Sequence, residues 1–332
     1  MKKLSPTIQT LCADLIQQVH SAIEKPGSVY TQTKQDRKYL FSRRLVGTVR
    51  RDTAIGPADN PEVQKRAAQV RGEQSSAKER RKIIATLRNN HVPVPTRELG
   101  NVLDVMADAG LFKDAVLVGT AAYICYSPII GVVLPIGALM TQDADLATAS
   151  LAIAADNSDD DNGSILSILK RADETFEPVP ALSKAAPSSS FKSETGFFVD
   201  LLTPQRRSSD TNPMPLKNLA AGAVPLQHLD WLIADPVRAV ALHGTGIPVS
   251  VPQPAKYAVH KLIVAQKRHK GEIAKRGKDL QQAEALIKAL KETDRYALHD
   301  AIEDASALGV RGWNQPIQRS LKELKIELDD LI

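Results

Sequence analysis

One stretch of the sequence limits the possible folds more than any other, because residues 115 to 140 contain no charged side chain over 26 consecutive positions. A run of this length must lie in a hydrophobic core or in a membrane, since it is long enough to span a bilayer. Glycine and proline interrupt it at positions 119, 128, 131, 135 and 137, and no cluster of Lys and Arg follows it. We therefore expect a strand followed by a buried helix, with no membrane contact.

Charge is distributed unevenly along the chain. Residues 1–100 carry 19 Lys and Arg against 9 Asp and Glu, whereas the remaining 232 residues carry 24 against 29. This imbalance predicts a basic module that faces a polyanion, beside a second module that holds the chemistry. The alternative is a helical region with solvated charged faces. Aromatic residues make up only 4% of the chain, which argues against a base-stacking surface.

The cysteines and the N-terminus indicate a cytoplasmic protein. Cys12 and Cys125 are far apart, fit no metal-ligand spacing and are expected to be reduced thiols. No apolar stretch follows the initial lysines, so we expect no secretory signal. The histidines show no metal-ligand spacing, and the chain has neither a Gly-rich dinucleotide fingerprint nor a Walker loop.

Hydrophobic periodicity predicts an α+β fold. Before residue 110 it indicates helices at 4–24, 61–89 and 97–108, with short strands at 28–33, 38–41 and near 45–49. In the middle it indicates strands at 115–118, 143–147 and 197–202, helices at 119–130, 147–155 and 164–172, and a polar loop at 188–190. From Pro254 onward the pattern is helical, and proline is common in the first turn of a helix.

An Asp-x-Asp pair is the first candidate for chemistry. In a strand, side chains two residues apart point to the same face, so Asp143 and Asp145 present two carboxylates about 7 Å apart. Two like charges inside a fold are costly unless a cation binds them. Carboxylate oxygens favour Mg²⁺ or Mn²⁺. Alone, the pair also fits a loop that caps the next helix.

A third aspartate strengthens this interpretation. Asp200 interrupts the apolar run from Phe197 to Leu202. A lone carboxylate inside such a strand needs a partner. On a strand beside Asp143 and Asp145, it completes a three-carboxylate site for two metal ions about 4 Å apart. These three residues are the predicted catalytic and metal-binding residues.

With Gly119-Thr120, these aspartates resemble the motifs of the DNA polymerase β-like nucleotidyltransferase superfamily. The chain is most similar to its small bacterial nucleotidyltransferases, which include toxin–antitoxin and abortive-infection enzymes. The similar stretches are Val118-Gly119-Thr120-Ala121-Ala122-Tyr123, Thr141-Gln142-Asp143-Ala144-Asp145, Val199-Asp200-Leu201-Leu202-Thr203-Pro204, and Ala258-Val259-His260-Lys261-Leu262 with Lys278-Asp279-Leu280. The superfamily usually has Gly-Ser where this chain has Gly119-Thr120, and the interval to Asp143 is longer than usual.

The resemblance implies a nucleotide-binding set. Gly119 and Thr120, at a helix N-terminus, are expected to hold the triphosphate of an NTP. Lys261 and Lys278 match positions that resemble phosphate-contacting lysines of the family. Their alternative role is an exposed basic helix face, and Asp279 is a candidate ion-pair partner for one of them.

The implied function is metal-dependent transfer of a nucleoside monophosphate from NTP to a hydroxyl of RNA or protein, with release of pyrophosphate. Mg²⁺ or Mn²⁺ is the expected cofactor, and Asp200 is expected to accept the proton of the attacking hydroxyl. The alternative is a catalytically inactive protein that binds nucleic acid or an antitoxin-like protein partner. The expected domains are a basic region (1–110), a small mixed-sheet nucleotidyltransferase core (111–252) and a helical C-terminal domain (253–332).

Overall fold

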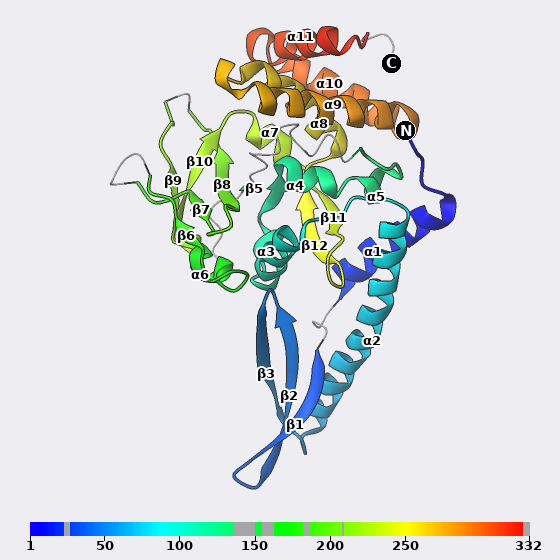
Figure 1. Cartoon of the computed structure of the whole chain (residues 1–332), viewed down its shortest axis with the longest axis vertical. Coiled ribbons are helices and arrows are strands. Elements are labelled where there is room, and N and C mark those ends of the chain that lie inside the picture. Colours follow the sequence, from blue (N-terminus) through cyan, green and yellow to red (C-terminus); the bar gives the residue numbers. More distant parts are fainter. Residues whose placement is uncertain (23–26, 136–149, 155–162, 182–185, 208, 328–332) are drawn as a thin grey trace.

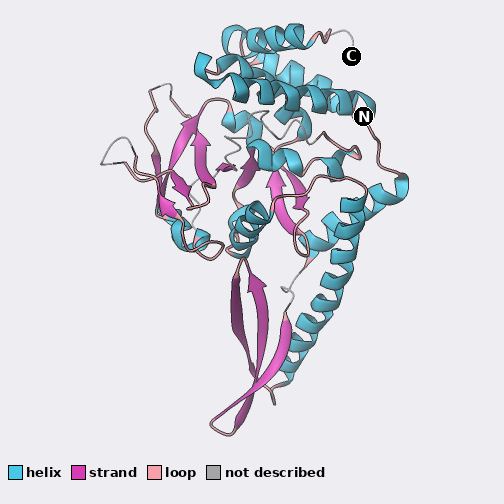
Figure 2. Cartoon of the chain, viewed as in Figure 1, coloured by secondary structure: helices cyan, strands magenta, loops and turns pink. Residues whose placement is uncertain are grey.

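A computed structural model describes residues 1–22, 27–135, 150–154, 163–181, 186–207 and 209–327. The molecule is elongated, with a narrow arm at one end of its long axis and a layer of helices at the other (Figure 1). Between them lies a mixed sheet with flanking helices (Figure 2). Helices combined with a mixed, curled sheet confirm the predicted α+β class.

The arm, which we define as residues 28–89, combines a three-stranded antiparallel sheet with a long helix. Its elements are β1 (Ser28–Lys34), β2 (Arg37–Val46), β3 (Val49–Pro57) and α2 (Pro61–Asn89). The polar residues Gln35 and Asp36 form the first turn with positive φ angles, which short polar side chains tolerate best. Asn60 caps α2 by accepting from the backbone N–H of Glu62. The third strand begins at Val49 rather than Leu45, because β2 continues to Val46.

Buried charges hold the base of the arm to the body. The carboxylate of Asp108, whose side chain is only 4% exposed, pairs with Arg44 at 2.7 Å and Arg51 at 3.1 Å, and also with Arg171. Arg44 and Arg51 belong to the arm, whereas Asp108 ends α3 (Arg97–Asp108). The turn between β2 and β3 approaches the body so closely that a Cβ atom on Gly47 would lie 2.8 Å from the Arg171 carbonyl oxygen. These contacts make the arm a fixed extension of the body.

The central sheet has the strand order β4-β5-β8-β10-β9, and β7 pairs with β8 and β6. Its strands are β4 (Val116–Val118), β5 (Ser150–Ala154), β6 (Glu177–Pro178), β7 (Ser190–Lys192), β8 (Phe198–Pro204), β9 (Met214–Leu216) and β10 (Ala221–Leu226). The strand β5 is antiparallel to β4 and parallel to β8. Short helices accompany the sheet, namely α4 (Gly119–Ile124), α5 (Ser127–Ile130), α6 (Ile165–Leu169) and α7 (Leu229–Ile233).

Two sequence predictions in this region are wrong. Residues 147–155 were expected to be helical, but Ser150–Ala154 is strand β5. Pairing with β4 and β8 overrides the helix propensity of this alanine-rich segment. The single helix expected at 119–130 is two short helices, because Pro128 lacks the backbone N–H that a continuous helix needs at that position.

The remaining elements enclose the body. Helix α1 (Pro6–Ser21) packs against the hairpin of β11 (Val237–Ala241) and β12 (Ile247–Val251). The C-terminal layer consists of α8 (Pro254–Lys267), α9 (Ile273–Thr293), α10 (Arg295–Ala307) and α11 (Gln315–Leu324). One continuous hydrophobic core runs from α3 through the sheet into this layer. Both cysteines are buried free thiols, and no helix within the described ranges is long and apolar enough to cross a membrane.

Candidate active site

The sheet aligns the end of β4 with the middle of β8. Val118 of β4 pairs with Ala152 of β5, and Ala152 pairs with Asp200 of β8. Neighbouring strands lie about 4.8 Å apart, so roughly 10 Å separates the backbones of Val118 and Asp200. The chain enters α4 at Gly119, directly after this row. Gly119 and Asp200 therefore border the same part of the sheet, with strand β5 between them.

Asp200 lies on the less buried face of β8. Val199 and Leu201, which point to the other face, are fully buried, whereas Asp200 is half-buried. Its β7 neighbour Ser190 donates a hydrogen bond from its hydroxyl to Oδ1 at 2.5 Å. Within the described part of the chain, Oδ2 accepts no hydrogen bond. Ser190 is thus not in a loop, as the sequence suggested, but in a strand where it orients the carboxylate.

Asp143 and Asp145 lie outside the described residues, as does the strand predicted at 143–147. In sequence they precede Ser150, the first residue of β5, by seven and five residues. The strand that they lead into is thus the one between β4 and β8. Among the residues that the structure describes, no group of three or more His, Cys, Asp and Glu side chains is arranged to hold a metal ion.

Gly119 and Thr120 are held by the C-terminal helices. Gly119 begins α4 with a φ of +65°, a conformation that glycine adopts without strain. The buried hydroxyl of Tyr257, on α8, donates to the Gly119 carbonyl oxygen at 2.9 Å. The Tyr257 hydroxyl also lies 2.8 Å from the Gln282 carboxamide of α9, which in turn lies 3.4 Å from the Thr120 hydroxyl. One buried polar chain therefore connects α8 and α9 to the first turn of α4.

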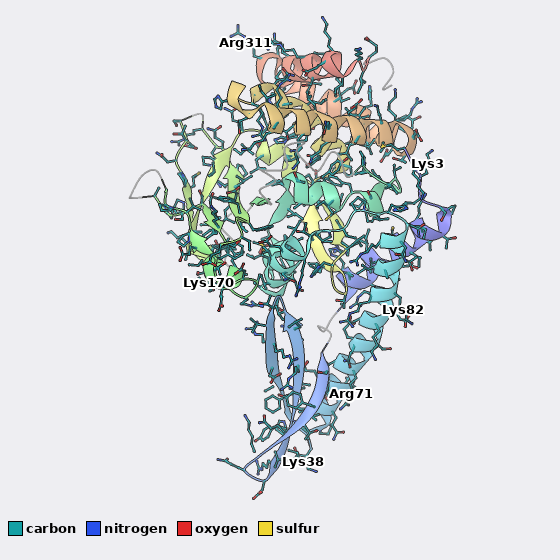
Figure 3. All side chains as sticks on the ribbon, in the orientation of Figure 1. Lys3, Lys38, Arg71, Lys82, Lys170 and Arg311 are labelled. Carbon is teal, nitrogen blue, oxygen red and sulfur yellow. The ribbon has the colours of Figure 1, made fainter. Side chains whose placement is uncertain are left out.

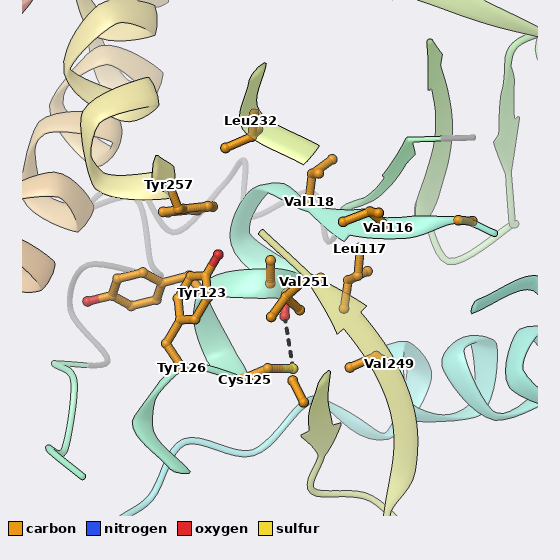
Figure 4. Close-up of a cluster of buried hydrophobic side chains, with 14 of the residues drawn as sticks. Val116, Leu117, Val118, Tyr123, Cys125, Tyr126, Leu232, Val249, Val251 and Tyr257 are labelled. Atoms are coloured by element: carbon orange, nitrogen blue, oxygen red, sulfur yellow. Dashed lines mark hydrogen bonds between the residues drawn. The ribbon is translucent and has the colours of Figure 1, made fainter. Parts of the chain in front are cut away.

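Tyr257 has close aromatic neighbours in the core, because Tyr123 and Tyr126 lie next to it (Figure 4). The ring of Tyr126 meets that of Tyr257 edge-on at 5.1 Å, and the Tyr123 ring lies 6.4 Å away. The Tyr123 hydroxyl is buried and has no hydrogen-bond partner in the described ranges. Burial raises the pKa of Tyr257 well above its usual value, so its hydroxyl stays protonated as a donor.

Lys261 extends this arrangement through an ion pair. Its ammonium lies 5.4 Å from the centre of the Tyr257 ring and 2.5 Å from Oδ1 of Asp279. Arg268 binds Oδ2 of the same carboxylate at 3.0 Å. Burial alone raises the pKa of Asp279, but the charges of Lys261 and Arg268 outweigh burial and lower it. The predicted pairing of Asp279 with a lysine is therefore present, and this carboxylate stays ionised.

Lys278 reaches the same region from α9. It precedes Gln282 by one helical turn, so the two side chains share a face. Burial, together with the nearby charge of Lys261, lowers the pKa of Lys278. The nearby charge of Asp279 offsets part of this effect.

His260 precedes Lys261 on α8 and is only 6% exposed. Its Nε2 atom has no hydrogen-bond partner among the described residues. Burial and the charge of Lys261 lower the pKa of His260 to about 3, so the ring is neutral at neutral pH.

Three polar residues of this region escaped sequence reasoning. Tyr257, Gln282 and Ser190 occupy ordinary helix or strand positions, and no spacing marks them. A cavity of about 640 Å³ lies elsewhere, at the base of the arm, where α3, Lys170 and Thr195 are among the residues that line it. Its lining includes neither Asp200 nor Gly119.

One substitution tests the connection between α8 and α4. In Tyr257→Phe, the Gly119 carbonyl loses a buried donor, which we expect to lower stability by about 1–3 kcal/mol. Because Gly119 then loses its positioning, we also expect KM for a substrate held at this turn to rise by about tenfold. Tyr126→Phe is the matched control, because it removes a buried hydrogen bond to the Pro252 carbonyl without touching Gly119. Chemical denaturation and steady-state kinetics measure both effects, and equal KM changes in the two variants would contradict the assignment.

The strand β4 thus turns through Gly119 into a helix, and Asp200 lies on the next strand but one. Helices α8 and α9 contact the same turn through Tyr257 and Gln282. Residues 97–307 match the sequence model of the nucleotidyltransferase family, which covers more than half of the chain. The protein therefore belongs to the nucleotidyltransferase family and is an enzyme of this class. Comparisons with curated proteins and with solved structures yield no match.

Proposed function

We propose that this enzyme transfers a nucleoside monophosphate from NTP to a hydroxyl of RNA or protein and releases pyrophosphate. The observation that carries the proposal is the row Val118–Ala152–Asp200. It supports a site in which the Gly119-Thr120 turn and a carboxylate face one substrate. The sequence interval that follows Asp145 leads directly into the strand between them.

The roles of the chain's own residues follow from their chemistry. The Thr120 hydroxyl and the backbone at Gly119 bind the triphosphate, and Lys261 and Lys278 provide positive charge beside it. The acceptor oxygen attacks the α-phosphorus, a new P–O bond forms, and the bond to the β-phosphate oxygen breaks. The hydroxyl proton passes to the Asp200 carboxylate, which Ser190 holds in position.

Nucleotidyltransferases generally use divalent metal ions. The donor chemistry of Asp200 fits such an ion, because Oδ2 is open within the described part of the chain and carboxylate oxygens suit Mg²⁺ or Mn²⁺. We propose Asp143, Asp145 and Asp200 as the ligands. A bound divalent ion supplies neutralisation of the charge on the triphosphate and on the attacking oxygen.

A labelling experiment tests the proposal. Each α-labelled NTP is incubated with the full chain and Mg²⁺ or Mn²⁺, and transfer of label is scored on total RNA and on proteins. We expect label on one of these acceptors from the wild type and none from Asp143→Ala combined with Asp145→Ala. Equal labelling by the double variant would exclude these carboxylates. If neither the wild type nor the double variant transferred label from any of the four nucleotides with either metal, the result would contradict nucleotidyl transfer.

A further inference from the structure

The arm is the most basic part of the molecule. Residues 28–90 carry 15 Lys and Arg against 6 Asp and Glu, a net charge of +9, while the rest of the chain is net acidic. Figure 3 shows Lys38 near the tip of the arm and Arg71 along α2, far from Arg311 at the opposite end of the molecule. A charge of this density on a projecting element attracts a polyanion.

One face of the arm sheet is open to solvent. Leu40, Ser42 and Val46, which alternate along β2, are buried. The residues between them point to the opposite face, where Leu45 is 64% exposed. Strand pairing brings further residues to this open face, namely Tyr30, Lys34, Arg37, Tyr39, Phe41, Arg43, Arg50 and Asp52.

The open face carries a layered aromatic platform. Tyr30 and Phe41 stack with ring centres 5.7 Å apart and planes 23° apart. The guanidinium of Arg43 lies over the Tyr30 ring at 4.7 Å, and the ammonium of Lys34 lies over the Phe41 ring at 5.2 Å. Aromatic rings are scarce in this chain, yet the fold gathers three on this face. The sequence-based argument against a stacking surface does not hold for the arm.

A carboxylate fixes the geometry of the platform. Asp52 accepts two hydrogen bonds from Arg43, at 2.8 and 2.9 Å, and a third from the Tyr30 hydroxyl at 2.9 Å. These hydrogen bonds, led by those from Arg43, lower the pKa of Asp52 to about 2. The same carboxylate therefore holds both the Arg43 guanidinium and the Tyr30 hydroxyl on this face. Arginine planes and aromatic rings are the groups on which unpaired bases stack.

Further cations surround this platform. Arg37, Lys38 and Arg50 are exposed, and the charge of Arg50 is close enough to Asp52 to help lower the pKa of that carboxyl. The arm is also long, because the ten residues of β2 extend about 33 Å at 3.3 Å per residue. This length spans about ten nucleotides of a stacked strand, whose repeat is roughly 3.4 Å. A polymer bound there extends toward the body, to which the Asp108 ion pairs hold the arm.

We propose that the open face of the arm binds RNA through single-stranded bases stacked on the Tyr30–Phe41–Arg43 platform, with phosphates on Lys34, Arg37 and Arg50. If the bound RNA is also the acceptor of the nucleoside monophosphate, this inference rests on the proposed function and identifies the acceptor as RNA rather than protein. RNA binding itself does not require catalysis. An experiment can therefore contradict RNA binding by the arm without contradicting the proposed function, and the reverse.

The test is direct binding of a fluorescent single-stranded RNA by the full chain across a salt series. The Asp200→Asn variant should bind like the wild type. Lys34→Ala with Arg37→Ala and Arg50→Ala removes three phosphate contacts, which should weaken binding at least tenfold at about 0.1 M salt and reduce the log–log salt slope by about 2. The matched control removes three exposed cations at the other end of the molecule, Lys291, Arg311 and Arg319, and should leave binding unchanged.

A second variant tests stacking rather than charge. Tyr30→Leu with Phe41→Leu keeps apolar bulk but removes both rings, and we expect at least a fivefold loss of affinity with the salt slope unchanged. Circular dichroism checks that the arm stays folded in each variant.

Several outcomes would overturn the proposal. One is equal binding of polyglutamate or heparin, which would make the arm a general polyanion patch, and another is tighter binding of single-stranded DNA than of RNA. A third is loss of binding only in Arg71→Ala with Lys78→Ala and Arg81→Ala on α2, since the contact would then lie on the helix. Label transfer to protein without RNA binding would also refute this inference and leave the proposed function intact. RNA binding without label transfer would support this inference and contradict the proposed function.

Discussion

Asp200→Asn is expected to lower kcat/KM for nucleotidyl transfer by about a thousandfold. Loss of a carboxylate with the proposed roles of metal ligand and proton acceptor removes several kcal/mol of transition-state stabilisation, and ~4 kcal/mol corresponds to this factor. The fold should be preserved, because an asparagine oxygen still accepts the Ser190 hydroxyl hydrogen bond. Steady-state kinetics with the labelled NTP measure the change.

The control for this variant is Asp14→Asn on α1, which removes one exposed negative charge far along the chain from the sheet. It should leave kcat/KM within a factor of two of the wild type. If Asp200→Asn retained more than a tenth of wild-type activity, Asp200 would be excluded as a metal ligand and as the proton acceptor. Unchanged melting behaviour would show that a loss of activity in Asp200→Asn does not come from misfolding.

The largest effect on stability is expected for Asp108→Asn. This carboxylate is almost fully buried and pairs with Arg44, Arg51 and Arg171. Removing one side of a buried ion pair costs about 3–5 kcal/mol, because the partner charges stay desolvated. Since Arg51 is about half exposed and can turn to water, we expect a value near the lower end, about 3 kcal/mol. Urea denaturation followed by circular dichroism measures it.

Asp52→Asn provides the comparison. Asp52 also binds an arginine, but both side chains of that pair lie largely in water. Exposed pairs contribute little to stability, so the urea midpoint should move far less than in Asp108→Asn. Equal shifts in the two variants would mean that burial of Asp108 does not determine its contribution. Protease cleavage within the arm should also become faster in Asp108→Asn, because the same ion pairs hold β2 and β3 to the body.

Local signals in the sequence predicted much of the fold. Helices α2 and α3 begin and end at the predicted residues, because Asn60 and Thr96 cap them and their apolar positions repeat at helical spacing. The turn at Gln35-Asp36 was equally readable from its polar residues. The strand at 150–154 was not, because its conformation depends on two neighbouring strands distant in sequence. The strands β9 to β12 were not predicted either, although buried apolar residues alternate along β12.

The candidate site also contains some residues that the sequence predicted and others that only the structure revealed. Residue chemistry singled out Asp143, Asp145 and Asp200, and resemblance added Gly119-Thr120 with Lys261 and Lys278. Contacts between α8, α9 and α4 were beyond sequence reasoning, since Tyr257 and Gln282 become partners of Gly119 and Thr120 only when residues more than a hundred positions apart meet. Asp143 and Asp145 remain predictions.

By itself, the sequence determined the class of fold, the boundaries of α2 and α3 and the reaction class, because these depend on local periodicity, capping and a short set of motifs. Only the tertiary structure decided that Asp200 stands one strand from the Gly119 turn, that Asp279 pairs with both Lys261 and Arg268, and that scattered aromatic and basic residues share one face of the arm. The physical reason is that strand pairing and burial join residues without regard to their separation along the chain.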